Sequence, residues 1–365
     1  MDDKKQSLKT MESFLLENKC KNILLVTGNK SFAISGAENY FKRIPKLNFI
    51  RFKDFSQNTN INDLEKGVDC FQKNKCDSVV AVGGGSVMDM GKLIALLGNF
   101  KGINIDSIKK YSSFNKRNIP LVCIPTTAGS GSECTHFAVL YDGNIKHSIA
   151  NNSLLPDEIL LEPKFSFSTN TYQRAVSGLD ALAQGIESLW AKNANKESQE
   201  LAKKSIKLVW GNLFKSVVEN NFDAHKKVFE GSILAGKAIN ISKTTAPHAL
   251  SYYFTTEHKI PHGHAVALTL NTIFNINRTN AKNSNDDKIK DVFKFLDKTL
   301  NIKNDNDSQI NNFISSLGIE LSFKNLGINL KEELKMIKSI VNLERLNNNP
   351  FNLNLDNIFK EKINE

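Results

Sequence analysis

The pattern of apolar positions in the first 150 residues alternates between two periodicities. Four short, continuous apolar runs predict buried strands, at 22–28, 49–52, 78–83 and 121–125. The amphipathic segments between them predict helices, at 31–44, 63–76 and 87–97. Strands that alternate with helices are typical of a parallel sheet covered on both faces. We therefore predict an α/β domain at the start of the chain.

From about residue 166 the pattern changes, and helical periodicity dominates to the end of the chain. The clearest predicted helices span 171–192, 197–220 and 226–241. Pro156 and Pro163 lie between the two patterns, where they favour a break in regular secondary structure. The sequence thus predicts two domains, an α/β domain over 1–160 and an all-α domain over 161–365.

Composition excludes several classes of protein. Hydrophobic residues make up 40% and charged residues 24%, as in an ordinary globular protein. No apolar run approaches the roughly 18–20 residues of a membrane span, and five scattered cysteines favour a cytoplasmic, reducing location. The net charge of +10 comes without a clustered basic module, so we expect no nucleic-acid partner and no membrane partner. A positive field can still attract an anionic cofactor or substrate.

The segment 82–92 contains three consecutive glycines between a predicted strand and a predicted helix. Glycine lets the backbone approach a phosphate closely, and a helix N-terminus offers unpaired N–H groups. We therefore predict that Gly84, Gly85, Ser86 and Asp89 bind a nucleotide cofactor. The alternative is a plain tight turn in which Ser86 caps the helix.

A second loop, 124–133, also follows a predicted strand and is rich in glycines and hydroxyl groups. Taken alone it is only a polar loop. Two such loops at strand ends of one sheet predict a dinucleotide crevice. The predicted cofactor-binding residues in and around it are Thr126, Thr127, Ser130, Ser132 and Lys146.

Four residues of the second domain are candidate ligands for one divalent metal. Asp180 and Gln184 lie four residues apart, so they share one face of a helix. His248 and His262 would add two imidazoles, and carboxylate with imidazole suits Fe(II) or Zn(II). Each histidine by itself is more often a structural residue, and Gln184 is the unusual member, because a third histidine would be the more familiar ligand.

Two further residues are candidates for catalysis. Tyr252 follows His248 by four positions, so it is expected to face the same site and to handle a proton; the alternative is a core aromatic. His264 is a candidate for a catalytic or substrate-binding role. The cationic or near-cationic candidates for binding an anionic substrate are His136, Lys146, His147, Arg174 and His264.

Four motifs occur in order along the chain, at 83–89, 125–133, 178–184 and 261–263. Together they resemble the iron-containing (group III) alcohol dehydrogenases, which are related to dehydroquinate synthase, from Asn22 to about Phe351. The resemblance implies a nucleotide-binding α/β domain followed by a helical metal-binding domain. It places Asp180, His248 and His262 at metal-ligand positions. Gln184 and Tyr252 stand where that family usually has histidine.

A narrower resemblance covers 177–190, 246–252 and 260–268, which are similar to the phosphonoacetaldehyde reductase branch. That branch carries Gln and Tyr at these two positions. The resemblance implies a metal-dependent, NAD(P)H-linked reduction of a small anionic aldehyde, phosphonoacetaldehyde, to 2-hydroxyethylphosphonate.

Three alternatives remain. One is a general alcohol dehydrogenase of the same family. Another is a lyase or glycerol-phosphate dehydrogenase of the superfamily, which the motifs at 125–133 and 261–263 disfavour. The third is a metal-free nucleotide-binding protein without turnover, which Gln184 permits.

The end of the first strand bears on the choice of cofactor. NAD-preferring relatives often carry an Asp there that repels a 2′-phosphate, whereas this sequence has Gly28, followed by Lys30 two residues later. We therefore favour NADP over NAD, with Gly28 and Lys30 as cofactor-binding residues, and we expect a homodimer.

Overall fold

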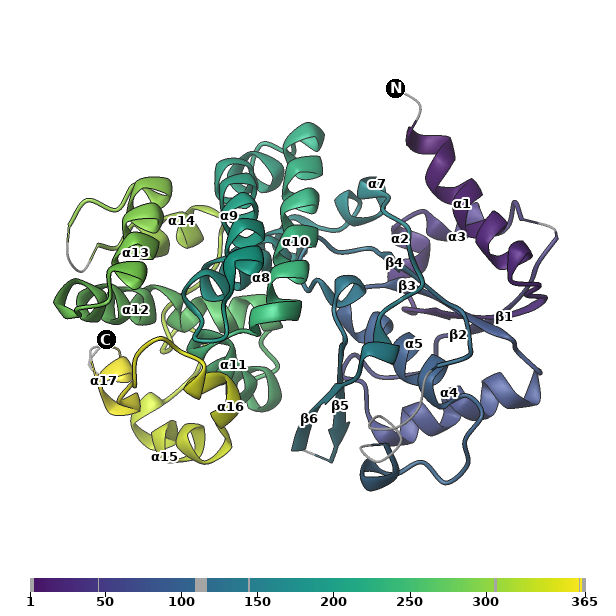
Figure 1. The fold of residues 1–365 in the computed structure, drawn as a ribbon. Helices are drawn as coiled ribbons and strands as arrows, with labels where there is room; N and C mark the ends of the chain where they lie inside the picture. The colour runs from purple at the N-terminus through teal and green to yellow at the C-terminus, as the bar shows by residue number, and fades with distance from the viewer. Residues whose placement is uncertain are drawn as a thin grey trace. The chain divides into compact units, whose positions relative to one another are not determined.

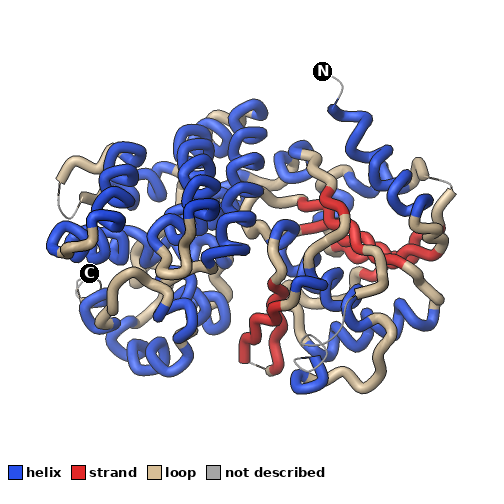
Figure 2. Tube along the Cα trace, viewed as in Figure 1, coloured by secondary structure: helices blue, strands red, loops and turns tan. Residues whose placement is uncertain are grey.

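The chain folds as two units, Met1–Asn170 and Thr171–Glu365, drawn in Figures 1 and 2. The structure is a computed structural model that describes residues 3–44, 46–108, 117–143, 145–304, 307–360 and 362. The first unit ends ten residues beyond the predicted boundary at 160. The short helix α7 (Pro163–Phe167) accounts for the difference, because its Phe165 packs in the core of the first unit with Ile124 and Leu160.

A five-stranded parallel sheet forms the centre of the first unit, in the order β2-β1-β3-β4-β7. Its strands are β1 (Asn22–Thr27), β2 (Asn48–Phe52), β3 (Ser78–Gly83), β4 (Leu121–Pro125) and β7 (Glu158–Ile159). The apolar runs of β3 and β4 are buried along their whole length, as expected for strands covered on both faces. The predicted α/β class with a parallel sheet is confirmed.

Helices cover both faces of this sheet (Figure 2). Successive side chains of a strand point to opposite faces, so Leu24 and Val26 join one core and Ile23 and Leu25 the other. The first core contains α4 (Ile61–Lys73) and α5 (Gly85–Leu97), and the second contains α1 (Asp3–Glu17), α2 (Ser31–Ile34) and α3 (Ala37–Phe41).

Two details of the first unit differ from the sequence prediction. The single helix expected over 31–44 is the pair α2 and α3, because Gly36 between them adopts a left-handed φ of 78° that interrupts helical geometry. An antiparallel hairpin of β5 (Phe137–Asp142) and β6 (Ile145–Ala150) was not predicted. Its pattern of alternation is weak, since β6 has a single buried residue, Ile149. Two short 3₁₀ turns, Ser132–Cys134 and Asn152–Leu154, flank the hairpin.

The described residues of the second unit form helices and no strands, as the sequence predicted (Figure 2). The helices are α8 (Thr171–Trp190), α9 (Lys196–Val217), α10 (Phe222–Ser242), α11 (Ala246–Glu257), α12 (His262–Asn283), α13 (Asp287–Leu300), α14 (Gln309–Ser316), α15 (Leu330–Ile340), α16 (Leu343–Asn347) and α17 (Leu355–Phe359). Helices α8, α9 and α10 pack against one another, and α11 and α12 pack on α16 and α8 respectively. Among the helices described, none is both long and apolar enough to span a membrane.

Candidate metal and nucleotide sites

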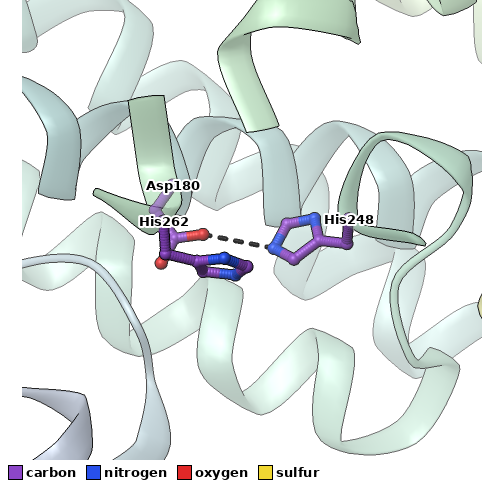
Figure 3. Close-up of side chains that lie close together, drawn as sticks. All are labelled: Asp180, His248 and His262. Carbon is purple, nitrogen blue, oxygen red and sulfur yellow. Dashed lines mark hydrogen bonds and ion pairs between the residues drawn. The ribbon is translucent and has the colours of Figure 1, made fainter. Parts of the chain in front are cut away.

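Three helices of the second unit bring Asp180, His248 and His262 together (Figure 3). One ligand atom from each lies within 4.8 Å of the other two. Asp180 Oδ1 is 3.2 Å from His248 Nε2, and the two imidazole rings are 5.2 Å apart between centroids. The structure therefore places three of the four predicted metal residues in one cluster.

Local sequence explains how α12 reaches this cluster. Pro261 precedes the helix and His262 is its first residue. Gly263 then faces α8 so closely that an added Cβ would lie 1.9 Å from the carbonyl oxygen of Val176 and 3.0 Å from Asp180 Cβ. Any larger residue at 263 would push α12 away from α8. Gly263 of the Pro-His-Gly motif is thus required for the close packing of α12 on α8.

Glu187 completes the cluster, although the sequence analysis did not single it out. It is fully buried, accepts a hydrogen bond from His248 Nδ1 at 2.5 Å, and also accepts from the backbone N–H of Thr245 at 2.6 Å. A carboxylate on one nitrogen of a histidine fixes the ring and leaves the other nitrogen to a metal. Spacing gave a signal for Glu187, because it follows Asp180 by seven residues and Gln184 by three, on one face of α8.

Electrostatics of the cluster follow from burial and from the two carboxylates. Burial lowers the pKa of His248, but Glu187 and Asp180 outweigh this effect and raise it to about 9. Burial raises the pKa of Asp180, but the hydrogen bond from His248 and the charge of His262 hold it below its usual value. His248 is therefore charged at neutral pH, and its Nε2 donates to Asp180 Oδ1.

Gln184 lies one turn after Asp180 and is buried. A hydrogen bond from its side chain helps to lower the pKa of Asp180. Its carbonyl oxygen Oε1 is also buried and accepts no hydrogen bond from the described residues. A carboxylate, two imidazoles and an amide oxygen are a donor set that suits Fe(II) or Zn(II), so the residues present fit a divalent metal. Direct ligation by Gln184 stays a prediction.

Tyr252 lies beside the cluster, with its ring 6.4 Å from that of His262. Its hydroxyl oxygen accepts a hydrogen bond from Nε of Arg345 at 3.0 Å. An arginine side chain has donors only, so the O–H proton of Tyr252 points elsewhere. Arg345 was missed by the sequence analysis because it lies 93 residues beyond Tyr252, on the five-residue helix α16.

The other catalytic candidate, His264, has a different environment. Both ring nitrogens are engaged, Nδ1 with the hydroxyl of Tyr172 at 2.9 Å and Nε2 with the carbonyl of Glu320 at 2.6 Å. These bonds hold α12 to neighbouring segments and favour a structural role over the predicted catalytic one. Arg174 donates to Asn220 at 2.7 Å. Its contacts likewise give no support to a role in substrate binding.

In the first unit the two predicted nucleotide loops lie against each other. The backbone N–H of Thr126 donates to the carbonyl of Gly83 at 2.8 Å. Added Cβ atoms at Gly84 and Gly85 would lie 3.3 Å from Thr127 Cγ2 and 3.2 Å from Ser130 Oγ. Small residues therefore permit the two loops to meet at the ends of β3 and β4.

Helix α5 begins at this meeting point. Its N-cap is Gly84, and no side chain caps it. Ser86 is therefore not the N-cap, contrary to the alternative reading of this segment. The first N–H groups of α5 remain suited to an anion such as a cofactor phosphate.

Asp89 and Ser132, both predicted to contact the cofactor, are bonded to each other. The hydroxyl of Ser132 donates to Asp89 Oδ1 at 2.7 Å and accepts from Lys92 Nζ at 3.0 Å. Lys92 also donates to the carbonyls of Thr135 at 2.8 Å and Phe137 at 2.9 Å. This buried network anchors the second loop to α5, so these bonds support a positioning role for Asp89 and Ser132.

The remaining cofactor candidates lie at the end of β1 and on the hairpin. Lys30 is exposed at the start of α2. Arg51, which the sequence analysis did not consider, donates to the carbonyl of Gly28 at 3.1 Å and to Thr27 Oγ1 at 2.8 Å. Lys146 is on β6. Burial raises the pKa of Asp89, and the charge of Lys146 offsets a part of that rise.

Comparison with known proteins identifies the class. The family described as "Iron-containing alcohol dehydrogenase" matches residues 4–163, and "Fe-containing alcohol dehydrogenase family, C-terminal" matches residues 174–361. The chain belongs to the iron-containing alcohol dehydrogenase family, as the ordered motifs predicted.

Individual relatives show how this family varies. The chain is 33% identical over 221 residues to the probable alcohol dehydrogenase EutG of Salmonella typhimurium, covering 60% of this chain and 56% of that protein. It is 30% identical over 243 residues to the 1,3-propanediol dehydrogenase of Citrobacter freundii, covering 66% and 61%. The chain spans between 27% and 61% of the length of the curated relatives it matches.

A solved structure matches over nearly the whole chain. The sulfoacetaldehyde reductase from Bifidobacterium kashiwanohense in complex with NAD+ superposes with a TM-score of 0.85 at 27% identity. The match covers 98% of this chain and 94% of that one.

Proposed function

We propose that the protein is an NAD(P)-linked oxidoreductase that interconverts an aldehyde and a primary alcohol at a divalent metal. The observation that carries this proposal is the cluster of Asp180, His248 and His262, oriented by Glu187, in a chain of the iron-containing alcohol dehydrogenase family. In the proposed direction a hydride adds to the carbonyl carbon and a proton to the oxygen, giving the alcohol and NAD(P)+.

The residues of the helical unit have separate parts in this reaction. When bound, the metal supplies Lewis acidity toward the carbonyl oxygen and the nicotinamide supplies the hydride. Asp180, His248 and His262 would hold the ion, with Gln184 as a fourth oxygen donor. Glu187 keeps His248 Nε2 turned toward Asp180. Tyr252, whose O–H proton points away from Arg345, is the group proposed to protonate the product oxygen.

In the first unit, the uncapped start of α5 and the loop at Thr126–Ser130 are proposed to bind the cofactor's phosphates and nicotinamide. Gly28 and Arg51 support a preference for NADP(H). Gly28 carries no carboxylate, and Arg51 of β2 places a cation against the end of β1, near where the ribose of a dinucleotide binds in folds of this type. The ratio of kcat/KM for NADPH to that for NADH measures this preference, and a ratio below one contradicts it.

For the substrate we propose a short aldehyde with an anionic group, with phosphonoacetaldehyde as the leading candidate. The support is the resemblance of the metal-site segments to the phosphonoacetaldehyde reductase branch. The sulfoacetaldehyde reductase with a similar fold acts on a related anionic aldehyde. The competing proposal is a general alcohol dehydrogenase, which the names of several relatives favour.

The test uses the full chain loaded with Fe(II) or Zn(II). NAD(P)H oxidation is followed with phosphonoacetaldehyde, sulfoacetaldehyde and propanal. We expect His262→Ala to lose most of its bound metal and to lower kcat by about 10³-fold or more. His258→Gln is the matched control, because His258 is bonded to Glu333 at 2.7 Å and contacts no member of the cluster. An undiminished rate for His262→Ala in metal-free buffer would remove the metal from the mechanism. Equal efficiency with propanal would favour the general dehydrogenase.

A further inference from the structure

Arg345 is a cation near the histidine cluster, and among the described residues its guanidinium group donates to two neutral hydroxyl groups. Nε donates to the hydroxyl of Tyr252 at 3.0 Å, and Nη1 donates to Thr244 Oγ1 at 2.6 Å. The side chain is half-buried, on α16. Tyr252, which accepts from Arg345, has its ring 6.4 Å from the ring of His262.

The nearby carboxylates are committed to other groups. Glu344 pairs with Lys243, and Glu187 binds His248 and Thr245. Among the residues that the structure describes, no carboxylate lies within ion-pair distance of Arg345. Burial lowers the pKa of Arg345, but Tyr252, Glu344 and Glu187 outweigh it and raise the value overall, so the group stays charged. A half-buried guanidinium without a carboxylate partner is costly, and an anionic ligand would offset that cost.

The other cations considered for an anionic substrate in this unit are occupied. Arg174 is bonded to Asn220, and burial lowers its pKa. His264 is bonded through both ring nitrogens, to Tyr172 and to the carbonyl of Glu320. Of these three cations, Arg345 is the one that contacts a residue of the proposed catalytic group.

We propose that Arg345 binds the anionic group of the substrate and so selects short aldehydes that carry a phosphonate or a sulfonate. This inference rests on the proposed function. Two of the five N–H donors of the guanidinium are used by Tyr252 and Thr244. Those that remain form a planar fork that matches two oxygens of a tetrahedral anion. Tyr252 contacts Arg345 through its hydroxyl, and its ring lies 6.4 Å from the ring of His262, so the guanidinium is next to a residue at the cluster.

The kinetic experiment measures kcat/KM of the metal-loaded enzyme for phosphonoacetaldehyde, sulfoacetaldehyde and propanal. Arg345→Gln also loses a contact with Tyr252, so all three values are expected to fall. The ratio of the anionic aldehydes to propanal should fall a further 10- to 100-fold, about the contribution of a charge-assisted hydrogen bond. Arg345→Lys should restore part of that ratio. Lys338→Gln, which removes an exposed cation paired with Asp356 on the same unit, is the matched control and should leave the ratio unchanged.

A binding experiment separates this inference from the proposed function. Ethylphosphonate and ethanesulfonate are titrated into the metal-loaded enzyme by calorimetry, which needs no turnover. We expect binding to the wild type and at least 10-fold weaker binding to Arg345→Gln. Such a loss of affinity supports anion binding by Arg345 even if no aldehyde is reduced. Comparing the two anions shows whether a phosphonate or a sulfonate is preferred. Unchanged ratios in the kinetic experiment, equal affinities of the two proteins, or no binding to the wild type would each overturn the proposal.

Discussion

Each unit contains a buried charged cluster, and the two clusters are organised differently. In the lysine cluster, made of Asp89, Lys92, Ser132 and Thr135, both charged groups are hydrogen-bonded by members of the cluster and by the adjacent strand β5. Lys92 donates to Ser132, Thr135 and Phe137, while Asp89 accepts from Ser132 and from the backbone of Val139. In the histidine cluster, made of Asp180, Glu187, His248 and His262, three ligand atoms converge within 4.8 Å.

The difference distinguishes a structural cluster from the proposed metal site. Burying charge costs free energy unless hydrogen bonds and counter-charges offset it. In the lysine cluster the protein supplies those partners itself, and the result is a fixed loop. In the histidine cluster two carboxylates face two histidines, and Oε1 of the neighbouring Gln184 accepts no hydrogen bond from the residues that the structure describes, so a cation would offset the buried negative charge. Substitutions in the lysine cluster should therefore mainly lower stability, whereas substitutions in the histidine cluster should mainly lower activity.

The largest expected effect on stability comes from Lys92→Met. Removing the fully buried ammonium group leaves Asp89 without its nearby cation and leaves two carbonyls without a donor. Breaking a buried charge network in this way costs about 3–5 kcal/mol. Urea denaturation, monitored by circular dichroism, measures the decrease in the free energy of unfolding. In the histidine cluster His262→Ala, at a half-buried position, is expected to cost only about 1 kcal/mol in metal-free protein.

The double variant Lys92→Met with Asp89→Asn is the control for this comparison. Neutralising Asp89 removes the uncompensated charge, so the double variant should be more stable than Lys92→Met alone. If the two lose the same stability, the charge of Asp89 is not the source of the cost.

The second prediction concerns pH. Glu133 lies beside the lysine cluster, and burial raises its pKa from 4.5 to about 7. Because the folded protein binds this proton more tightly than the unfolded chain, the contribution to stability is complete below pH 4.5 and is lost as pH rises through 7. The loss is about 3 kcal/mol. Urea denaturation between pH 5 and 8 should show it in the wild type and not in Glu133→Gln. Parallel pH profiles for the two proteins would contradict the prediction. The pKa of Asp180 is lowered, so its contribution has the opposite sign: that contribution to the stability of the protein is lost as the pH falls.

The local pattern of apolar and polar residues predicted most of the fold and part of the candidate site. Apolar runs placed the strands of the parallel sheet, and helical spacing placed Asp180 and Gln184 on one face. Motifs at strand ends located the two loops that meet at Gly84 and Thr127. What local pattern did not give depends on contacts between distant residues. The sequence around Arg345 has no periodicity that points to Tyr252, and nothing in the segment 82–92 indicates that Asp89 faces Ser132 rather than a ligand.

The smallest expected effect is a change in metal affinity at the edge of the histidine cluster. It concerns Gln184, which either ligates the metal through Oε1 or only donates to Asp180. If Gln184 is a ligand, Gln184→His should bind the metal about 10-fold more tightly and Gln184→Leu about 10-fold more weakly, in line with typical changes at residues around a metal. Competition with a chelator measures both dissociation constants. Leucine removes both the amide oxygen and the hydrogen bond to Asp180, whereas an imidazole at this position can supply a nitrogen ligand in place of Oε1. Equal affinities for the two variants would mean that position 184 holds Asp180 in place and leaves the fourth coordination position to water.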